Sequence, residues 1–176
     1  PYSLTESEVA AFDHVIRERR SIRAWTNERV PDEVIRKLLT AGSWAAHSCN
    51  MQSIRYIVVR EENAPGLVPE WMPEPGPVHI LILQDERTYN ANSIMPIRNR
   101  LLDAGAAAQN IILAAHAYGL GGVWLTHMDR DLKKLSEYFN LESYMRITTY
   151  VDVGYPGYFP PQPGKMGLED IVLKWI

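Results

Sequence analysis

The chain has 176 residues, of which 46% are hydrophobic and 22% are charged, and its formal net charge is -3. These values predict one globular domain over residues 1–176, and the negative balance argues against binding to nucleic acid or to acidic membranes. The single cysteine, Cys49, excludes an internal disulfide, and with an N-terminus that lacks a signal-peptide pattern it predicts a cytoplasmic protein.

The first third of the chain predicts two helices and a strand. Thr5 and Glu8 have the spacing of a capping box, and apolar residues recur at helical intervals, so a helix is expected from about Glu6 to Arg19. A second helix is expected to start at Pro31, because proline is favoured in the first turn. The β-branched run over residues 53–60 predicts a strand.

The middle of the chain predicts a loop, a strand and a turn. Five prolines between Glu61 and Pro77 leave no room for regular structure, and Trp71 and Met72 within this loop suit a lid. Residues 78–84 form a continuous apolar run, which predicts a central strand covered on both faces. Residues 85–96 are polar and are expected to be turn-like.

Residues 101–118 predict the central helix of the fold. Apolar side chains surround its axis, which indicates burial on most sides, and its small residues would let a second copy of the helix approach. Gln109 and Asn110 interrupt the apolar run before it reaches the length of a membrane span. Gly119 is expected to end the helix in a left-handed conformation, and residues 121–125 predict a short buried strand.

The last third predicts one more helix and one more strand. Asp129 is expected to cap a helix that ends near Asn140, and residues 145–155 read as a strand. A proline-rich and glycine-rich loop follows over residues 156–167. The apolar C-terminus, residues 168–176, is expected to pack against a neighbouring subunit. Four strands and five helical segments predict an α+β layered domain.

Familiar motifs for phosphate loops, dinucleotide turns and zinc helices are missing, and the histidines lack the spacing of metal ligands. We therefore expect no metal, and we expect His79 and His116 to be structural. Within residues 17–23, three guanidinium groups (Arg19, Arg20 and Arg23) and the hydroxyl of Ser21 arrive at the end of a helix, which fits either a phosphate site or a solvated helix terminus. Because no side-chain chemistry is apparent, a bound cofactor would have to supply it.

Four segments, in this order, resemble the nitroreductase family of FMN-dependent oxidoreductases. They are R-R-S-I-R at residues 19–23, A-G-S-W-A-A-H-S-C-N-M-Q at 41–52, D-A-G-A-A-A-Q-N-I-I-L-A-A-H-A-Y-G-L-G-G-V-W-L at 103–125, and V-G-Y-P ending at Pro156. The resemblance implies a mixed β-sheet flanked by helices. It also implies a domain-swapped homodimer with a long buried central helix and one FMN in each of two sites at the subunit interface.

The same resemblance implies a set of cofactor-binding residues. The FMN phosphate and ribityl chain would be held by Arg19, Arg20, Ser21 and Lys165. The flavin of the partner subunit would be reached by Ala46, His47, Ser48, Asn50 and Gln52. Trp124 would pack beside the flavin ring, and the backbone amides around Thr126 and His127 would face flavin N5, with Leu125 also part of the cofactor site. Arg23 would lie near flavin N1 and O2, where a fixed cation favours the reduced cofactor and raises its potential.

The resemblance thus implies an FMN-dependent NAD(P)H oxidoreductase that passes hydride through flavin N5 to a small organic acceptor such as a nitroaromatic or a quinone. His47 is the candidate proton donor. One alternative is a flavin-destroying or reductive-dehalogenase relative on the same fold, and another is a non-catalytic FMN-binding module. A nucleic-acid binder using residues 17–23 is disfavoured by the net charge.

Overall fold

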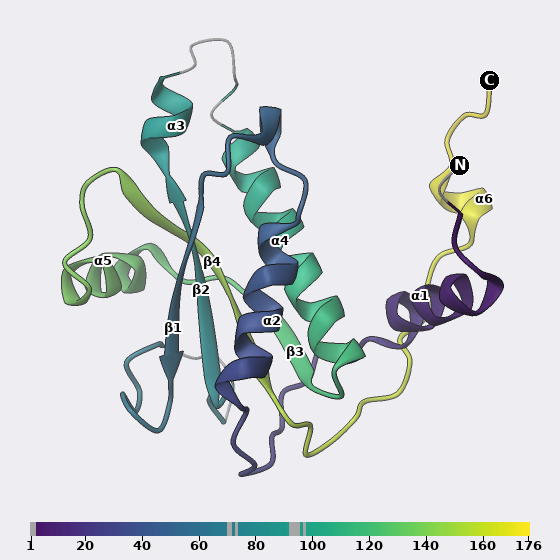
Figure 1. The fold of residues 1–176 in the computed structure, drawn as a ribbon, viewed down its shortest axis with the longest axis horizontal. Helices are drawn as coiled ribbons and strands as arrows, with labels where there is room; N and C mark the ends of the chain where they lie inside the picture. The colour runs from purple at the N-terminus through teal and green to yellow at the C-terminus, as the bar shows by residue number, and fades with distance from the viewer. Residues whose placement is uncertain (1–2, 70–71, 73, 92–95, 97) are drawn as a thin grey trace.

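The computed structural model describes residues 3–69, 72, 74–91, 96 and 98–176. Its centre is a four-stranded sheet in the order β1-β2-β4-β3, in which all neighbouring strands are antiparallel (Figure 1). The strands are β1 (Ile54–Arg60), β2 (Val78–Asp85), β3 (Gly121–Leu125) and β4 (Met145–Gly154). A single parallel bridge between Ser21 and Gly122 extends the sheet beyond β3 and makes it mixed at that edge.

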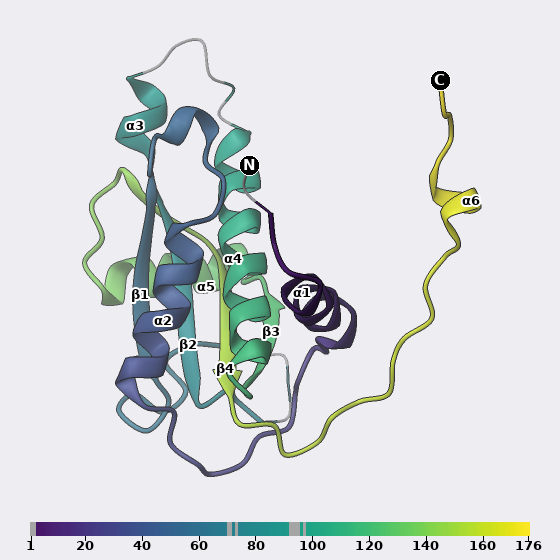
Figure 2. The same cartoon turned by 45° about the vertical axis from the view of Figure 1, so that its right-hand side comes forward.

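The described residues also form six helices and one 3-10 turn. They are α1 (Glu6–Glu18), α2 (Asp32–Ser43), α3 (Glu86–Asn90), α4 (Asn99–Ala117), α5 (Asp129–Tyr138), α6 (Leu168–Ile171) and the turn η1 (Ser48–Asn50). Helices α2 and α4 pack together over one face of the sheet, and α5 lies against the other face (Figures 1 and 2). In the described part of the chain, no helix combines the length and the apolar character that crossing a bilayer requires.

Every residue of β2 is buried, which confirms the predicted central strand. Ile80 and Ile82 belong to the core formed with α2 and α4, whereas Leu81 and Leu83 belong to the core formed with α5. Successive side chains of a strand point to opposite faces, so a continuous apolar run serves both layers.

The turn between α4 and β3 agrees with the prediction that Gly119 ends the helix in a left-handed conformation. Gly119 has φ 77°, and the Leu120 amide donates to the Ala115 carbonyl at 2.8 Å, so the chain reverses directly into β3. At Gly121 a side chain would meet another segment, because an added Cβ would lie 2.6 Å from Ile22 Cβ. Glycine at this position lets the segment after α1 lie directly on the edge of β3.

Helix α1 and the C-terminal tail stand apart from the layered core. The predicted capping box is present, since the Glu8 amide donates to Thr5 Oγ1 at 3.3 Å and the Thr5 amide donates to the Glu8 carboxylate at 2.7 Å. All of α1 is described, and none of its residues is buried. The tail over residues 157–176 runs away from the sheet (Figure 2), and its apolar residues are exposed within this chain.

Three sequence expectations need correction. The segment over residues 85–96, expected to be turn-like, contains α3, because the Asp85 carboxylate caps the Arg87 amide at 3.2 Å and Tyr89 is buried. The residue that caps α5 is Met128, and Asp129 is instead its first helical residue. The number of helical segments is therefore larger than five. Trp71 of the expected lid lies outside the described residues.

Candidate functional site

The segment after α1 is fixed to the edge of the sheet. Ser21 bridges Gly122 in parallel, and the Ile22 amide donates to the Gly122 carbonyl at 3.2 Å. Ile22 is fully buried, so it anchors the segment in the core while Ser21 remains half-buried beside β3. The sequence R-R-S-I-R is thereby held against a rigid strand.

Two neighbouring arginines at this place carry more positive charge than their surroundings neutralise. Arg20 is 7% exposed, donates to the carbonyls of Arg17 and Arg19 at 2.8 and 3.0 Å, and pairs with the Glu18 carboxylate at 3.2 Å. Its Nε is buried without a hydrogen-bond partner. Burial, and then the adjacent Arg20, lower the pKa of Arg19. Two guanidinium groups against one carboxylate form a site that suits a phosphate.

Aromatic rings pack behind these arginines. His116 of α4 stacks on His14 with 6.4 Å between ring centroids and on Phe159 with 6.0 Å, and the Arg20 guanidinium lies 5.9 Å from the Phe159 ring. Burial and the nearby cations lower the pKa of His116. The expectation that His116 is structural agrees with this packing.

The two other basic residues of the expected site are exposed. Arg23 donates to the Ser21 carbonyl at 3.5 Å, so it lies just beyond the anchored segment. Lys165 lies on the C-terminal tail.

The loop between α2 and β1 presents the second group of expected residues. Ala46, Asn50 and Gln52 are exposed, and the backbone is left-handed at Cys49, Asn50 and Gln52, with φ of 49°, 51° and 49°. His47 is half-buried and its Nε2 has no hydrogen-bond partner. Non-glycine residues seldom adopt this conformation, so three of them in one short loop indicate a shape that the surrounding structure imposes.

A small hollow of about 150 Å³ lies beside this loop, between the end of α2 and β1. It is lined by Ser43, His47, Gln52, Ile54, Arg55 and Tyr56. Burial raises the pKa of Tyr56 to about 12, so its phenol stays protonated at neutral pH. The expected residues His47 and Gln52 therefore share a polar niche.

The third group lies at the exit of β3. Trp124 is 42% exposed, and its indole Nε1 donates to Thr149 Oγ1 at 2.6 Å, while that hydroxyl donates to the Leu125 carbonyl at 2.5 Å. Thr126 is exposed, and the His127 ring stacks on Tyr150 with 4.0 Å between centroids. This chain of hydrogen bonds fixes the indole, so that its exposed surface is rigid.

The three groups occupy different parts of one chain. The loop contacts Asp103 at the beginning of α4, whereas the arginines lie near His116 at its end, about 20 Å further along the axis at the rise of an α-helix. Trp124 returns to the level of Gly105, where an added Cβ would lie 3.2 Å from the indole. No hydrogen bond between described residues links the loop to the arginine pair or to the exit of β3.

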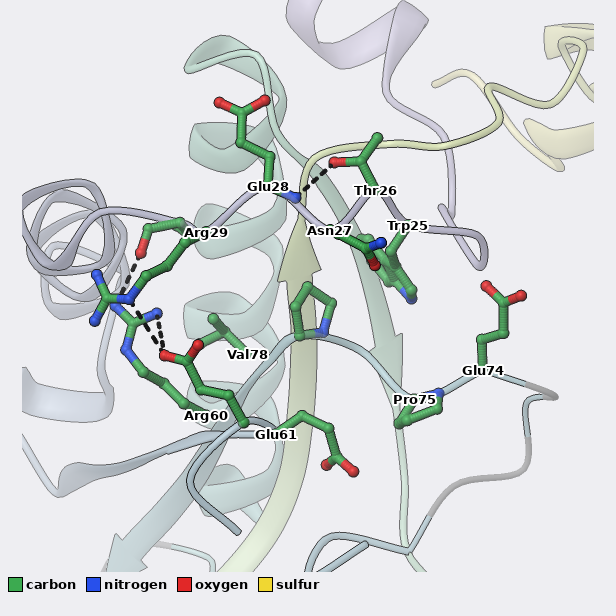
Figure 3. A pocket seen from close by; sticks show the side chains of 13 residues that line it. Trp25, Thr26, Asn27, Glu28, Arg29, Arg60, Glu61, Glu74, Pro75 and Val78 are labelled. Atoms are coloured by element: carbon green, nitrogen blue, oxygen red, sulfur yellow. Dashed lines mark hydrogen bonds and ion pairs between the residues drawn. The ribbon is translucent and has the colours of Figure 1, made fainter. Parts of the chain in front are cut away.

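A separate cavity of about 370 Å³ lies where the connection between α1 and α2 crosses the ends of β1 and β2 (Figure 3). Trp25 and Glu61 are among its lining residues, and none of the expected cofactor residues is. Its arginines are already paired, because Arg60 donates to the Val30 carbonyl at 2.8 Å and Arg29 pairs with Glu62 at 3.2 Å. An anion would find no free cation there.

Sequence reasoning missed Asp103 and Tyr89 as part of this region. Asp103 is 3% exposed and accepts hydrogen bonds from Ser48 and from the Tyr89 hydroxyl. Burial, and then the hydrogen bond to Asp103, raise the pKa of Tyr89 to about 12. A lone acid in an otherwise apolar helix was the available signal, because a buried carboxylate requires donors.

Comparisons with known proteins agree with the fold and with the order of the segments. The model of the Nitroreductase family matches residues 16–155. A protein of Methanothermobacter thermautotrophicus, named provisionally as an NADH dehydrogenase/NAD(P)H nitroreductase, is 28% identical over 94% of this chain and 87% of its own. A protein of Archaeoglobus fulgidus with the same name is 31% identical over 81% of this chain and 83% of its own.

Among solved structures, one from Desulfovibrio desulfuricans, described provisionally as a nitroreductase in complex with FMN, superposes with a TM-score of 0.82. It is 29% identical and the match covers 94% of this chain and 96% of that chain. A structure from Clostridium acetobutylicum, described provisionally as an NADH oxidase, has a TM-score of 0.78 and 31% identity, covering 92% and 99% of the two chains. The chain therefore belongs to the nitroreductase family of FMN-dependent oxidoreductases, as its four segments predicted.

Proposed function

We propose that this chain uses FMN to pass hydride from NAD(P)H through flavin N5 to a small organic acceptor, such as a nitroaromatic or a quinone. The observation that carries the proposal is the pair of arginines at the end of α1. Among the described residues, Glu18 is the one carboxylate that pairs with this arginine pair, through Arg20, and the pair lies beside a segment that is bonded to the edge strand β3. The excess of positive charge on a rigid support fits the terminal phosphate of FMN.

The residues of this chain have distinct parts in the proposal. Arg19, Arg20 and Ser21 bind the phosphate and ribityl chain, with Lys165 approaching from the tail. Arg23, which is exposed beyond the anchored segment, would supply a positive charge near flavin N1 and O2. The amides of residues 126 and 127, which would lie near the flavin ring, directly follow Leu125, the last residue of β3, whose carbonyl accepts from Thr149.

The exposed face of the Trp124 indole is proposed to pack beside the flavin ring. Its indole is 42% exposed within one chain, and its hydrogen bond to Thr149 fixes its orientation. Aromatic rings favour offset-stacked or edge-to-face contact, so an indole held in one orientation would pack beside the flavin ring. His47, with an unpartnered ring nitrogen, is the proposed proton donor.

We further propose that the active form is a homodimer whose two chains exchange their C-terminal tails. The exposed apolar surface supports this step. Phe12 of α1 is 59% exposed, Leu102 of α4 is 67% exposed, and Trp175 of the tail is 92% exposed. Isolated apolar residues on a surface are normal, whereas an apolar helix face together with an apolar tail favours burial by a second chain. The loop over residues 46–52 would then complete the cofactor site of the partner.

The test is a titration of apoprotein with FMN, followed by turnover. Flavin fluorescence gives the dissociation constant, and oxidation of NADH or NADPH is then measured with a nitroaromatic and with a quinone. Bound flavin and acceptor-dependent oxidation are expected. A protein that binds no FMN under these conditions would refute the proposal, and bound FMN without turnover would favour a non-catalytic module.

The exposed thiol of Cys49 is in keeping with the proposed cytoplasmic location.

A further inference from the structure

We infer that Asp103 is a positioning residue: its carboxylate holds the loop over residues 48–52 in the shape that contacts the cofactor, an inference that rests on the proposed function. Asp103 lies in the first turns of α4 and is 3% exposed. Its Oδ1 accepts from the Ser48 amide at 3.1 Å and from Ser48 Oγ at 3.2 Å, and its Oδ2 accepts from the Tyr89 hydroxyl. The contact joins residues that are far apart in sequence. In Figures 1 and 2 the loop lies beside the N-terminal end of α4.

The loop needs an external support because its own backbone is unfavourable. Cys49, Asn50 and Gln52 have positive φ, although none of them is glycine. Each such backbone conformation costs of order 1 to 3 kcal/mol of folding free energy, and it persists only where the surrounding structure imposes it. Ser48 is the point from which the turn is built, since its carbonyl accepts the Met51 amide at 3.1 Å. A displacement of Ser48 would therefore move Asn50 and Gln52 as well.

A second support fixes the other end of the loop. Ser53 is fully buried, its hydroxyl donates to Gln84 Oε1 at 2.6 Å, and its carbonyl accepts the Asp85 amide at 2.8 Å. Gln84 Nε2 donates in turn to the Arg100 carbonyl at 2.8 Å. Both ends of the loop are thus tied to the beginning of α4, whereas Asn50 and Gln52 between them are exposed and available to a ligand. A strained, exposed segment held at both ends is the arrangement of a preorganised binding loop.

The contacts of Asp103 also define what its carboxylate contributes. Both of its oxygens accept from groups that remain protonated at neutral pH: the amide and hydroxyl of Ser48 and the phenol of Tyr89. Its role is therefore the placement of an acceptor and not the transfer of a proton. Asparagine in its place keeps Oδ1 for Ser48 and turns its amide toward the Tyr89 oxygen, which can accept.

Three variants test the inference. Asp103→Ala removes the acceptor, Asp103→Asn keeps it, and Tyr89→Phe removes a hydroxyl that contacts Asp103 and Ser48 but leaves the Asp103 acceptor in place. For each, the FMN dissociation constant, the reduction potential of bound FMN and the hydrogen exchange of the amides over residues 48–52 are measured. We expect Asp103→Ala to weaken FMN binding about 10- to 100-fold and to speed exchange in the loop. Asp103→Asn should restore binding to within about 3-fold, and Tyr89→Phe, which keeps the acceptor for the Ser48 amide, should speed loop exchange less than Asp103→Ala does.

Hydrogen exchange in the unaltered apoprotein keeps the test valid if Asp103→Ala does not fold. The Ser48 amide, although only half-buried, should be protected, because it donates to Asp103. An unprotected Ser48 amide, unchanged FMN binding in a folded Asp103→Ala, or equal losses in the Ala and Asn variants would each overturn the inference. A wild-type protein with a protected loop but no affinity for FMN would instead refute the proposed function, so the two failures are distinguishable.

Discussion

Replacement of Arg19 by alanine separates binding of the cofactor from stability of the fold. The Arg19 side chain has no hydrogen bond or ion pair with another described residue, and burial and the neighbouring Arg20 both disfavour its charge. Its removal should therefore leave the melting temperature of the apoprotein unchanged or slightly higher. An arginine whose charge is disfavoured by its surroundings, and whose side chain pairs with no described group of the protein, is expected to bind a ligand.

The expected loss of affinity follows from the contact that Arg19 would make. A hydrogen bond to a charged group contributes about 1.5 to 3 kcal/mol, which corresponds to about 10- to 100-fold in the dissociation constant of FMN. Riboflavin, which has no phosphate, should bind the variant and the wild type equally. The phosphate-dependent part of the affinity should also decrease with added salt.

The assay is quenching of flavin fluorescence at constant ionic strength, together with thermal unfolding of the apoprotein. Arg17→Ala is the matched control, because it removes one charge from the same end of α1 at an exposed position. It should change FMN affinity by less than about 3-fold, since an exposed charge is screened. Equal FMN affinity in wild type and Arg19→Ala, or equal losses for FMN and riboflavin, would show that the arginine pair does not bind the phosphate.

Three further predictions concern stability and assembly. Gly121→Ala should lower the free energy of unfolding in urea by about 1 to 3 kcal/mol, because the new Cβ would lie 2.6 Å from Ile22 Cβ. Gly164→Ala is the control and should be neutral, because an added Cβ there has nothing within 4 Å. Equal free energies of unfolding for the two variants would refute the close packing at Gly121. Because the pKa of His116 is lowered in the folded protein, the unfolded chain binds its proton more readily. The contribution of His116 to folding stability is therefore full above about pH 6.5 and is lost as the pH decreases below that value. In thermal unfolding, the melting temperature of His116→Gln should decrease less with acid than that of the wild type, and identical pH profiles would contradict this. Removal of residues 168–176 should shift sedimentation from dimer to monomer while the core still unfolds cooperatively, and an intact dimer would exclude tail exchange as its basis.

Patterns that are local in sequence determined most of the fold. The capping box at Thr5 and Glu8, the left-handed Gly119 and the two-faced strand β2 were all predicted correctly. Each depends on residues within a few positions of one another, so periodicity and turn chemistry suffice. The order of four short segments also indicated the family before any fold was known.

Elements that depend on distant contacts were predicted less well. Helix α3 is short, and its propensity is weak without the cap at Asp85 and the burial of Tyr89. The residue that caps α5, Met128, lies one position before the predicted cap, Asp129, and helix boundaries commonly differ by one or two residues from a sequence pattern. Local pattern alone cannot resolve such boundaries.

By itself, the sequence determined which residue types are available for a flavin site: cations at the end of the first helix, a polar loop after the second and an indole on a short strand. Only the tertiary structure decided how these residues are supported. Ser21 forms a β-bridge with Gly122, the Ser48 amide donates to Asp103, and the Trp124 indole donates to Thr149. Each of these contacts joins segments far apart along the chain. Their geometry follows from how α4 packs against α2 and the sheet, and no local pattern encodes that packing.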